Sequence, residues 1–289
     1  MKNLKMLLMP ILGIIATFVI VQTQMVNKLV IKSENVIQTA VEKPINPGIV
    51  ESFGLNTQVF AAADSKEFYQ NWLNNEEVKI WNNFKLMFNI TKQESDALKI
   101  EWQKEYVQLV EKMNREELAT APLITEDNKK LVETVLQEFG IDPATVSIIN
   151  WNKNSLGGST DKSIYINQKF MLNMPIKVKK HVIGHEIGHM LNKDHSTCFV
   201  IAQLRAIYKI EDSPEVTKAL QDFTYFKELR ADITALMQGK DYVEGAIMSM
   251  EHDLEAATAA KVVQKESLSH PSDRLRCDIA QNFLKVVTV

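Results

Sequence analysis

Cysteine is scarce in this chain of 289 residues, where only Cys198 and Cys277 occur. Two cysteines cannot build a framework of several disulfides, and nothing in their spacing shows whether their side chains meet. Net positive charge is also lacking, because 33 lysines and arginines stand against 36 aspartates and glutamates. Without a basic stripe and interleaved aromatics, the sequence gives no support to a nucleic-acid partner.

Long hydrophobic runs are absent except at the N-terminus, where residues 6–26 contain no charge. About 20 apolar residues span the hydrocarbon layer of a bilayer, whereas the apolar region of a secretory signal is roughly 7 to 15 residues long. The nearest small-residue cleavage site, at 61–63, lies far downstream. We therefore expect residues 1–26 to be a single-pass membrane anchor, with a long signal peptide as the alternative.

Lysines flank this anchor on both sides. Their distribution favours a cytoplasmic N-terminus and an extracytoplasmic body, with a body on the cytoplasmic face or a secreted protein as alternatives. Residues 27–63 contain prolines and glycines without a sustained helical period, which predicts a linker. Residues 64–144 are predicted to form a helical region whose core contains the aromatic residues that recur at helical spacing, namely Phe68, Trp72, Trp81, Phe84 and Phe88.

Start and stop signals divide this helical region. Thr91 and Glu94 form a capping-box signature, which predicts a helix that continues to about residue 117. Thr125 is predicted to open the next helix and Gly140 to close it.

Residues 145–289 combine the signals of strands and helices. Two short strands are predicted at 146–151 and 163–167, around a turn at Gly157 and Gly158. Helices are predicted at about 176–192 and 214–238, and Pro271 is expected in the first turn of a last helix. The sequence therefore predicts an α+β fold that is mainly helical and carries a small β-hairpin at its edge.

The stretch HEIGH at 185–189 carries the strongest chemical signal. Residues four apart on a helix project from the same face, so His185 and His189 can bind one zinc ion. Glu186 can then act as the general base for a zinc-activated water. Gly184 and Gly188 each lower helix stability by about 1 kcal/mol relative to alanine, which suits a place where another segment approaches closely.

Zinc needs a third protein ligand, and His195 is one candidate. It fits the long metzincin pattern except that Asn192 stands where that pattern has glycine. A metzincin also places a methionine in a tight turn under the metal. The next methionine here, Met237, falls inside a predicted helix, which weakens this alternative.

Glu228 is the other candidate, on a helix face with small neighbours that it shares with Asp232 one turn later. Two buried carboxylates repel unless a cation lies between them. Glu228 is therefore expected to bind zinc, with Asp232 accepting the spare N–H of a ligand histidine. The alternative is that both acids are solvated and paired with Lys227 or Arg230.

A further cluster, SHPSDRLRC, contributes His270 and Arg276. Pro271 disfavours helical backbone at His270, so this histidine is expected at a helix entrance, with Arg276 about one and a half turns into the helix. Together they suit stabilisation of an oxyanion, whereas alone they are more often a capping histidine and a surface arginine. His181, one turn before His185, is expected to be a surface histidine, with a position at the edge of the cleft as the alternative.

HEIGH, the ExxAD motif at 228–232 and a histidine-proline followed by an arginine occur here in one order. This order resembles the gluzincin metallopeptidases of the HtpX and CAAX-prenyl-protease kind, and the stretch NSLGGSTDKSIYIN resembles the edge strand that these enzymes lay beside substrate. The family of the phage-exclusion protease Lit is similar in size and also combines HExxH with a downstream acid. The resemblance covers about 145–280 and implies a zincin-like metallopeptidase domain at 145–289.

The resemblance also implies a role for each motif residue. The metal ligands would be His185, His189 and Glu228, with Glu186 as the base and Asp232 behind the ligands. The contacts to the substrate carbonyl would come from His270 and Arg276.

The expected function is that of a membrane-anchored zinc endopeptidase with one Zn²⁺ per chain and a protein or peptide substrate. The strand around 164–166 is expected to hold substrate by strand addition. Two alternatives stay open. One is a metzincin-type protease that uses His195, and the other is a non-catalytic chaperone or interaction protein in which Asp194 or His195 completes a closed zinc site. The sequence does not define the substrate or the oligomeric state.

Overall fold

The computed structural model describes residues 60, 63–120, 122–151, 155–259 and 270–288. The predicted anchor at 1–26 and nearly all of the predicted linker at 27–63 lie outside these residues. Within the described part of the chain, no helix has both the length and the apolar character needed to cross a bilayer.

Helices dominate the described residues, as the sequence predicts, and a small sheet interrupts them. The elements in chain order are α3 (Lys66–Phe88), α4 (Lys92–Glu101), α5 (Gln103–Thr120), α6 (Glu126–Glu138), a 3₁₀ turn (Pro143–Thr145), β1 (Ser147–Asn150), β2 (Gly157–Thr160), β3 (Ser163–Ile166), α7 (Gln168–Met171), α8 (Ile176–Leu191), α9 (Asp194–Ile207), α10 (Pro214–Leu236), α11 (Lys240–Ala259) and α12 (Asp273–Val287). The prediction of a mainly helical α+β fold is confirmed.

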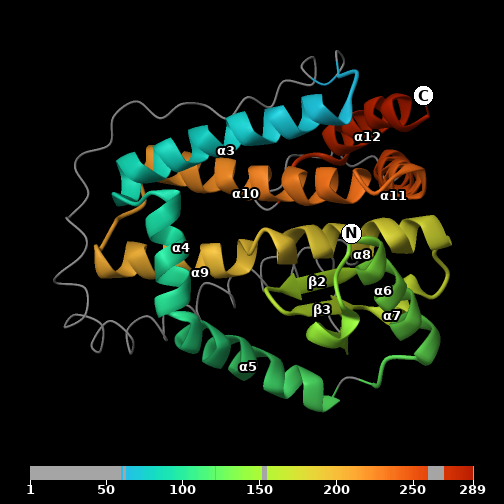
Figure 1. Cartoon of the computed structure of the whole chain (residues 1–289), viewed down its shortest axis with the longest axis horizontal. Helices are drawn as coiled ribbons and strands as arrows, with labels where there is room; N and C mark the ends of the chain where they lie inside the picture. Colours follow the sequence, from blue (N-terminus) through green and yellow to red (C-terminus); the bar gives the residue numbers. More distant parts are fainter. Residues whose placement is uncertain (1–59, 61–62, 121, 152–154, 260–269, 289) are drawn as a thin grey trace, which may run out of the picture.

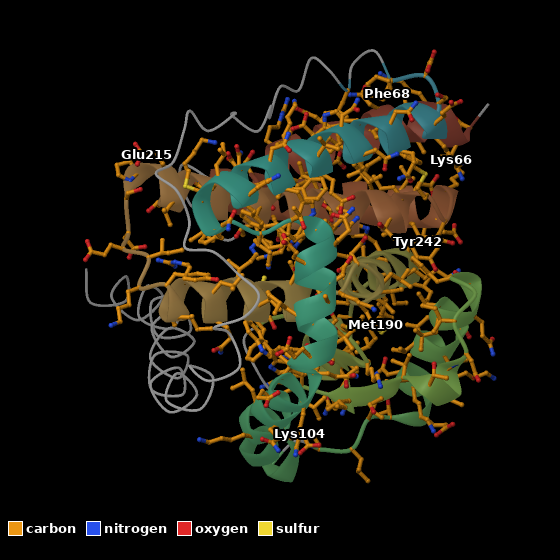
Figure 2. The ribbon with its side chains drawn as sticks, turned by 60° about the vertical axis from the view of Figure 1, so that its left-hand side comes forward. Lys66, Phe68, Lys104, Met190, Glu215 and Tyr242 are labelled. Atoms are coloured by element: carbon orange, nitrogen blue, oxygen red, sulfur yellow. The ribbon has the colours of Figure 1, made fainter. Side chains whose placement is uncertain are left out.

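These elements are arranged in layers (Figure 1). The helix α3 lies along α10, and α8 lies between α10 and the sheet. The helix α4 crosses the molecule from the end of α3 to the start of α5 near Lys104, as Figure 2 shows from a second direction. The helix α8, which carries the HEIGH stretch, is therefore enclosed between α10 and the sheet.

The main hydrophobic core joins helices from both ends of the described chain. Of the aromatics predicted to be core residues, Trp72, Phe84 and Phe88 are buried, and Phe68 and Trp81 pack against this core with part of their surface exposed. Aromatic contacts link α3 to the C-terminal half, because Phe84 packs on Phe223 and Tyr69 packs on Phe283. The regions 64–144 and 145–289 thus share one core.

The cysteines fall in or against the same core without forming a bridge. Cys277 is buried within it, and Cys198 packs against it from α9. Both are free thiols.

The sheet differs from the prediction. It has three strands in the order β1-β3-β2, with β1 parallel and β2 antiparallel to β3. The glycines expected to form a turn lie in β2, and the turn itself is made by Asp161 and Lys162. A β-carbon on Gly158 would lie 1.9 Å from the Trp151 ring. The absence of a side chain at Gly158 therefore allows the Trp151 ring to pack directly on β2.

The strand order also corrects the expected substrate strand. Residues 164–166 belong to β3, which pairs on both sides and has no free edge. Ile164 and Ile166 face α8 in a second hydrophobic core, which also contains residues of α6. The edge strand beside α8 is β2.

Helix ends follow local signals with two exceptions. The capping box of Thr91 and Glu94 is present, but the helix that it opens ends at Glu101 and a new one begins at Gln103. Gly140 closes α6 with a left-handed φ of 71°. Pro271 precedes α12 instead of lying in its first turn, because Ser272 takes the N-cap position and accepts a hydrogen bond from the amide of Leu275.

Gly184, directly before HEIGH, and Gly188, within it, both lie where another helix approaches closely, as expected. A β-carbon on Gly188 would lie 2.8 Å from Cα of Ala231 in α10, and one on Gly184 would lie 2.9 Å from the ring of Tyr242 in α11. The backbones of α8 and α10 therefore approach closely at the level of HEIGH.

We expect Gly188→Ala to destabilise the protein, although alanine favours helix by about 1 kcal/mol. The added methyl group would meet backbone atoms of Ala231, which cannot rotate away. Overpacking of this kind costs roughly 1–3 kcal/mol. Urea denaturation in the presence of a chelator should show a lower free energy of unfolding, and an unchanged or higher value would contradict the contact.

Candidate metal centre

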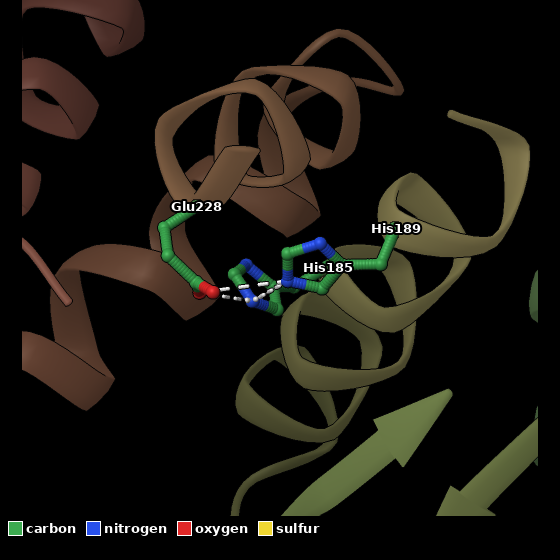
Figure 3. A group of neighbouring side chains, drawn as sticks. All are labelled: His185, His189 and Glu228. Atoms are coloured by element: carbon green, nitrogen blue, oxygen red, sulfur yellow. Dashed lines mark hydrogen bonds and ion pairs between the residues drawn. The ribbon is translucent and has the colours of Figure 1, made fainter. Parts of the chain in front are cut away.

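Three buried side chains from α8 and α10 converge on one point (Figure 3). The Nε2 atoms of His185 and His189 are 3.0 Å apart, and each lies 3.4 Å from Oε2 of Glu228. Among the described residues, His185, His189 and Glu228 form a group that could hold a metal ion. Oε2 of Glu228 is buried and has no hydrogen-bond donor in the described structure.

The Nδ1 atom of His185 faces a second carboxylate. It lies 2.7 Å from Oδ1 of Asp232, one turn after Glu228 on α10. Arg276 of α12 donates to both oxygens of Asp232, with Nε at 2.7 Å and one terminal nitrogen at 2.8 Å. This fork fixes the carboxylate, and the carboxylate fixes the imidazole with Nε2 directed at Glu228.

His189 is held in the same way, by Asp194 and Arg230. Its Nδ1 atom lies 2.8 Å from Oδ2 of Asp194. Asp194 is the first residue of α9, and the preceding Lys193 has a left-handed backbone conformation. Arg230 donates to the other oxygen of Asp194. From the sequence, Asp194 is expected only as a fourth ligand in the closed-site alternative, and Arg230 only as a partner of solvated acids on its own helix. An acid just beyond the turn after HEIGH was the only available signal.

Charge explains how these groups coexist in the interior. Burial disfavours the protonated ring of His185, but Asp232 outweighs this and raises the pKa of His185 to about 10. Burial also opposes ionisation of Asp232, and Arg276 outweighs it and lowers the pKa of that carboxyl. For Glu228, the neighbouring His189 and His185 overcome burial and lower the pKa. The lowered pKa values keep both carboxyls ionised next to the two histidines.

The alternative of solvated acids does not hold, because Glu228 and Asp232 are only 4% and 3% exposed. Nζ of Lys227 lies 3.6 Å from Oε1 of Glu228. The histidines face the other oxygen, Oε2.

Glu186 lies beside this group without belonging to it. Its side chain is partly exposed, and its Oε2 accepts a hydrogen bond of 3.0 Å from Ser159 of β2. A β-carbon on Gly157 would lie 3.2 Å from Cγ of Glu186, so the glycine leaves room for the glutamate under the edge strand. The side chain of Glu186, which follows His185 in the sequence, thus lies against β2.

The remaining histidines take different positions. Nε2 of His270 lies 3.2 Å from Oε2 of Glu228, and 49% of its side chain is exposed. His195 stays outside the metal group, with its ring centroid 6.3 Å from that of His189. The prediction of a surface position for His181 was wrong. This residue is buried, and burial lowers its pKa to about 3.

No protein-family model matches this chain, and no curated protein or solved structure matches it either. The resemblance to gluzincin metallopeptidases is therefore carried by the motifs alone.

We expect metal content to separate the two candidate third ligands. Glu228→Ala removes one of three converging donors, so the purified protein should lose its metal on dialysis. His195→Ala should retain it, because this ring lies outside the group. Elemental analysis of both variants checks this, with His252→Ala on the exposed surface of α11 as the control. Loss of metal in His195→Ala and retention in Glu228→Ala would contradict the assignment.

Proposed function

We propose that this chain is a zinc-dependent endopeptidase with a zincin-like domain, in which His185, His189 and Glu228 hold the metal. The supporting observation is the spacing of the three donor atoms. In a tetrahedral zinc site with bonds of roughly 2.0–2.1 Å, neighbouring donor atoms lie about 3.3 Å apart. The three atoms here are separated by 3.0, 3.4 and 3.4 Å.

The donor set favours catalysis over a structural role. Two imidazoles and one carboxylate are three protein ligands, which leave a fourth position open, whereas structural zinc sites are closed by four. A zinc ion bound there would supply Lewis acidity, which lowers the pKa of water and polarises a carbonyl group. Its position next to Glu186 makes hydrolysis the reaction that the residues serve best.

Glu186 is the proposed proton carrier. Its carboxylate accepts a proton from the attacking water and then gives that proton to the nitrogen of the leaving amine, so that one water is consumed for each peptide bond broken. Ser159 donates to Oε2 of Glu186 and so restricts the rotation of the carboxylate. This contact ties the proposed base to the strand that borders the site.

The same strand is the proposed substrate platform, in place of residues 164–166. The amide of Asn167 donates to the carbonyl of Leu156, which makes these residues a hydrogen-bonded antiparallel pair. Because such pairs alternate, Gly157 and Ser159 direct their backbone groups to the free edge of β2. An extended peptide can pair there with its scissile bond near Glu186.

His270 and Arg276 receive different roles. His270 is half exposed and lies against Glu228, so it suits contact with a substrate carbonyl oxygen. Arg276 is a positioning residue, because both of its contacts at hydrogen-bond distance go to Asp232. The substrate is proposed to be a protein or peptide, and the membrane anchor at 1–26 with an extracytoplasmic body stays a prediction from the sequence.

We expect Glu186→Gln to abolish hydrolysis and to retain the metal. Removal of a general base lowers the rate by about 100- to 10,000-fold. Glutamine has nearly the same shape as glutamate but cannot accept the proton. The metal should be retained, because residue 186 is not one of the three candidate ligands. Cleavage of unfolded casein and of a fluorogenic peptide library, with zinc content measured on the same samples, checks this.

Glu215→Gln on the exposed start of α10 is the control for loss of one charge and should cleave at the wild-type rate. Chelation should stop wild-type cleavage, and added zinc should restore it. Cleavage by Glu186→Gln at the wild-type rate would refute the role of the base. A wild-type protein that holds zinc and cleaves none of these substrates would favour the closed, non-catalytic zinc site.

A further inference from the structure

A chain of charged residues leads from His189 away from the metal group and into the N-terminal helices. Nδ1 of His189 contacts Asp194, and Arg230 donates to Asp194 through one terminal nitrogen. The other terminal nitrogen of Arg230 donates to Oε1 of Glu77 in α3 at 3.1 Å. Lys92 at the start of α4 lies 2.9 Å from the same oxygen.

Exposure rises in steps along this chain. Side-chain exposure is 1% for Asp194, 13% for Arg230, 22% for Glu77 and 49% for Lys92. Charge-assisted hydrogen bonds between buried groups are stronger than exposed ion pairs, so the inner part of the chain is the rigid part. The guanidinium of Arg230 also lies over the Phe226 ring at 4.9 Å, which fixes its plane.

The position of Asp194 has a simpler explanation that its contacts do not support. An aspartate in the first turn of a helix is often found there because it interacts favourably with the helix dipole or caps the free amides. Here the N-cap is Lys193, which makes no side-chain cap, and the two oxygens of Asp194 go to His189 and Arg230. The carboxylate is directed at the histidine.

We propose that Asp194, Arg230 and Glu77 are positioning residues for the metal ligand His189, so that α3 is part of the metal centre. This inference rests on the proposed metal site. Asp194 orients the imidazole, Arg230 holds Asp194 in place, and Glu77 holds the second arm of the Arg230 fork. The arrangement mirrors Asp232 and Arg276 behind His185, with one further residue supplied by the N-terminal helices.

The test uses the full-length protein and the variant Glu77→Gln, with Glu67→Gln as its control. Glu67 lies on the same helix, is exposed and loses the same charge. Zn²⁺ affinity is measured by competition with a chromogenic chelator, and the visible absorption of bound Co²⁺ reports ligand geometry. Urea unfolding of the metal-free proteins measures stability separately.

We expect Asp194→Asn to weaken Zn²⁺ binding about 10- to 100-fold and Glu77→Gln to weaken it about 3- to 10-fold. Glu77→Gln should also shift the Co²⁺ spectrum, which a purely structural role of Glu77 would leave unchanged. Glu67→Gln should bind as the wild type does. In the double variant, the Glu77 substitution should add nothing to the loss caused by Asp194→Asn, because it acts through Asp194.

Three outcomes would overturn the inference. One is wild-type Zn²⁺ affinity together with an unchanged Co²⁺ spectrum in Glu77→Gln, and another is an independent, additive loss in the double variant. If Asp194→Asn does not fold, the comparison of Glu77→Gln with Glu67→Gln still decides whether Glu77 has a positioning role or a purely structural one. A wild-type protein that binds neither metal would refute the proposed metal site itself, so this failure is distinguishable from the others.

Discussion

The structure depends on the burial of three carboxylates around two imidazoles. Asp194, Glu228 and Asp232 are nearly inaccessible to water, and isolated charges in that position would be strongly destabilising. Arginines neutralise the two aspartates, whereas Glu228 faces the imidazoles with one oxygen and Lys227 with the other. A divalent cation at the imidazoles would balance the charge of Glu228. It would also require the Nε2 atoms of both histidines to be unprotonated.

This constraint explains the packing of the surrounding helices. The three candidate ligands come from α8 and α10, whose backbones meet at Gly188 and Ala231, so their donor atoms converge without long side chains having to bridge a gap. The supporting arginines come from α10 and α12, and Glu77 adds α3. Hydrogen bonds and ion pairs thus connect helices from the beginning and the end of the described chain to two neighbouring rings on α8.

The predictable part of the site is the part set by local spacing. HEIGH and the ExxAD motif each lie within a few residues on one helix, so helical geometry alone predicts which side chains share a face. The contacts of Asp194 and Arg230 are not predictable in this way, because their partners lie on other helices and no local pattern encodes a contact such as Arg230 to Glu77. His181 was misplaced for the same reason, since its burial results from the packing around α8. The glycines of β2 predict a turn when the sequence is considered locally, because the neighbours that require them, Trp151 and Glu186, lie outside that strand.

The shared core has a practical consequence for anyone who wishes to express only the half that carries the candidate metal centre. A fragment that starts near residue 145 would keep all three candidate ligands, yet it would remove the aromatic face of α3 from α10 and α12. The uncovered apolar surface would favour self-association. A fragment made for crystallography or enzymology should therefore begin at or before Phe60, the first described residue whose side chain is buried in that core.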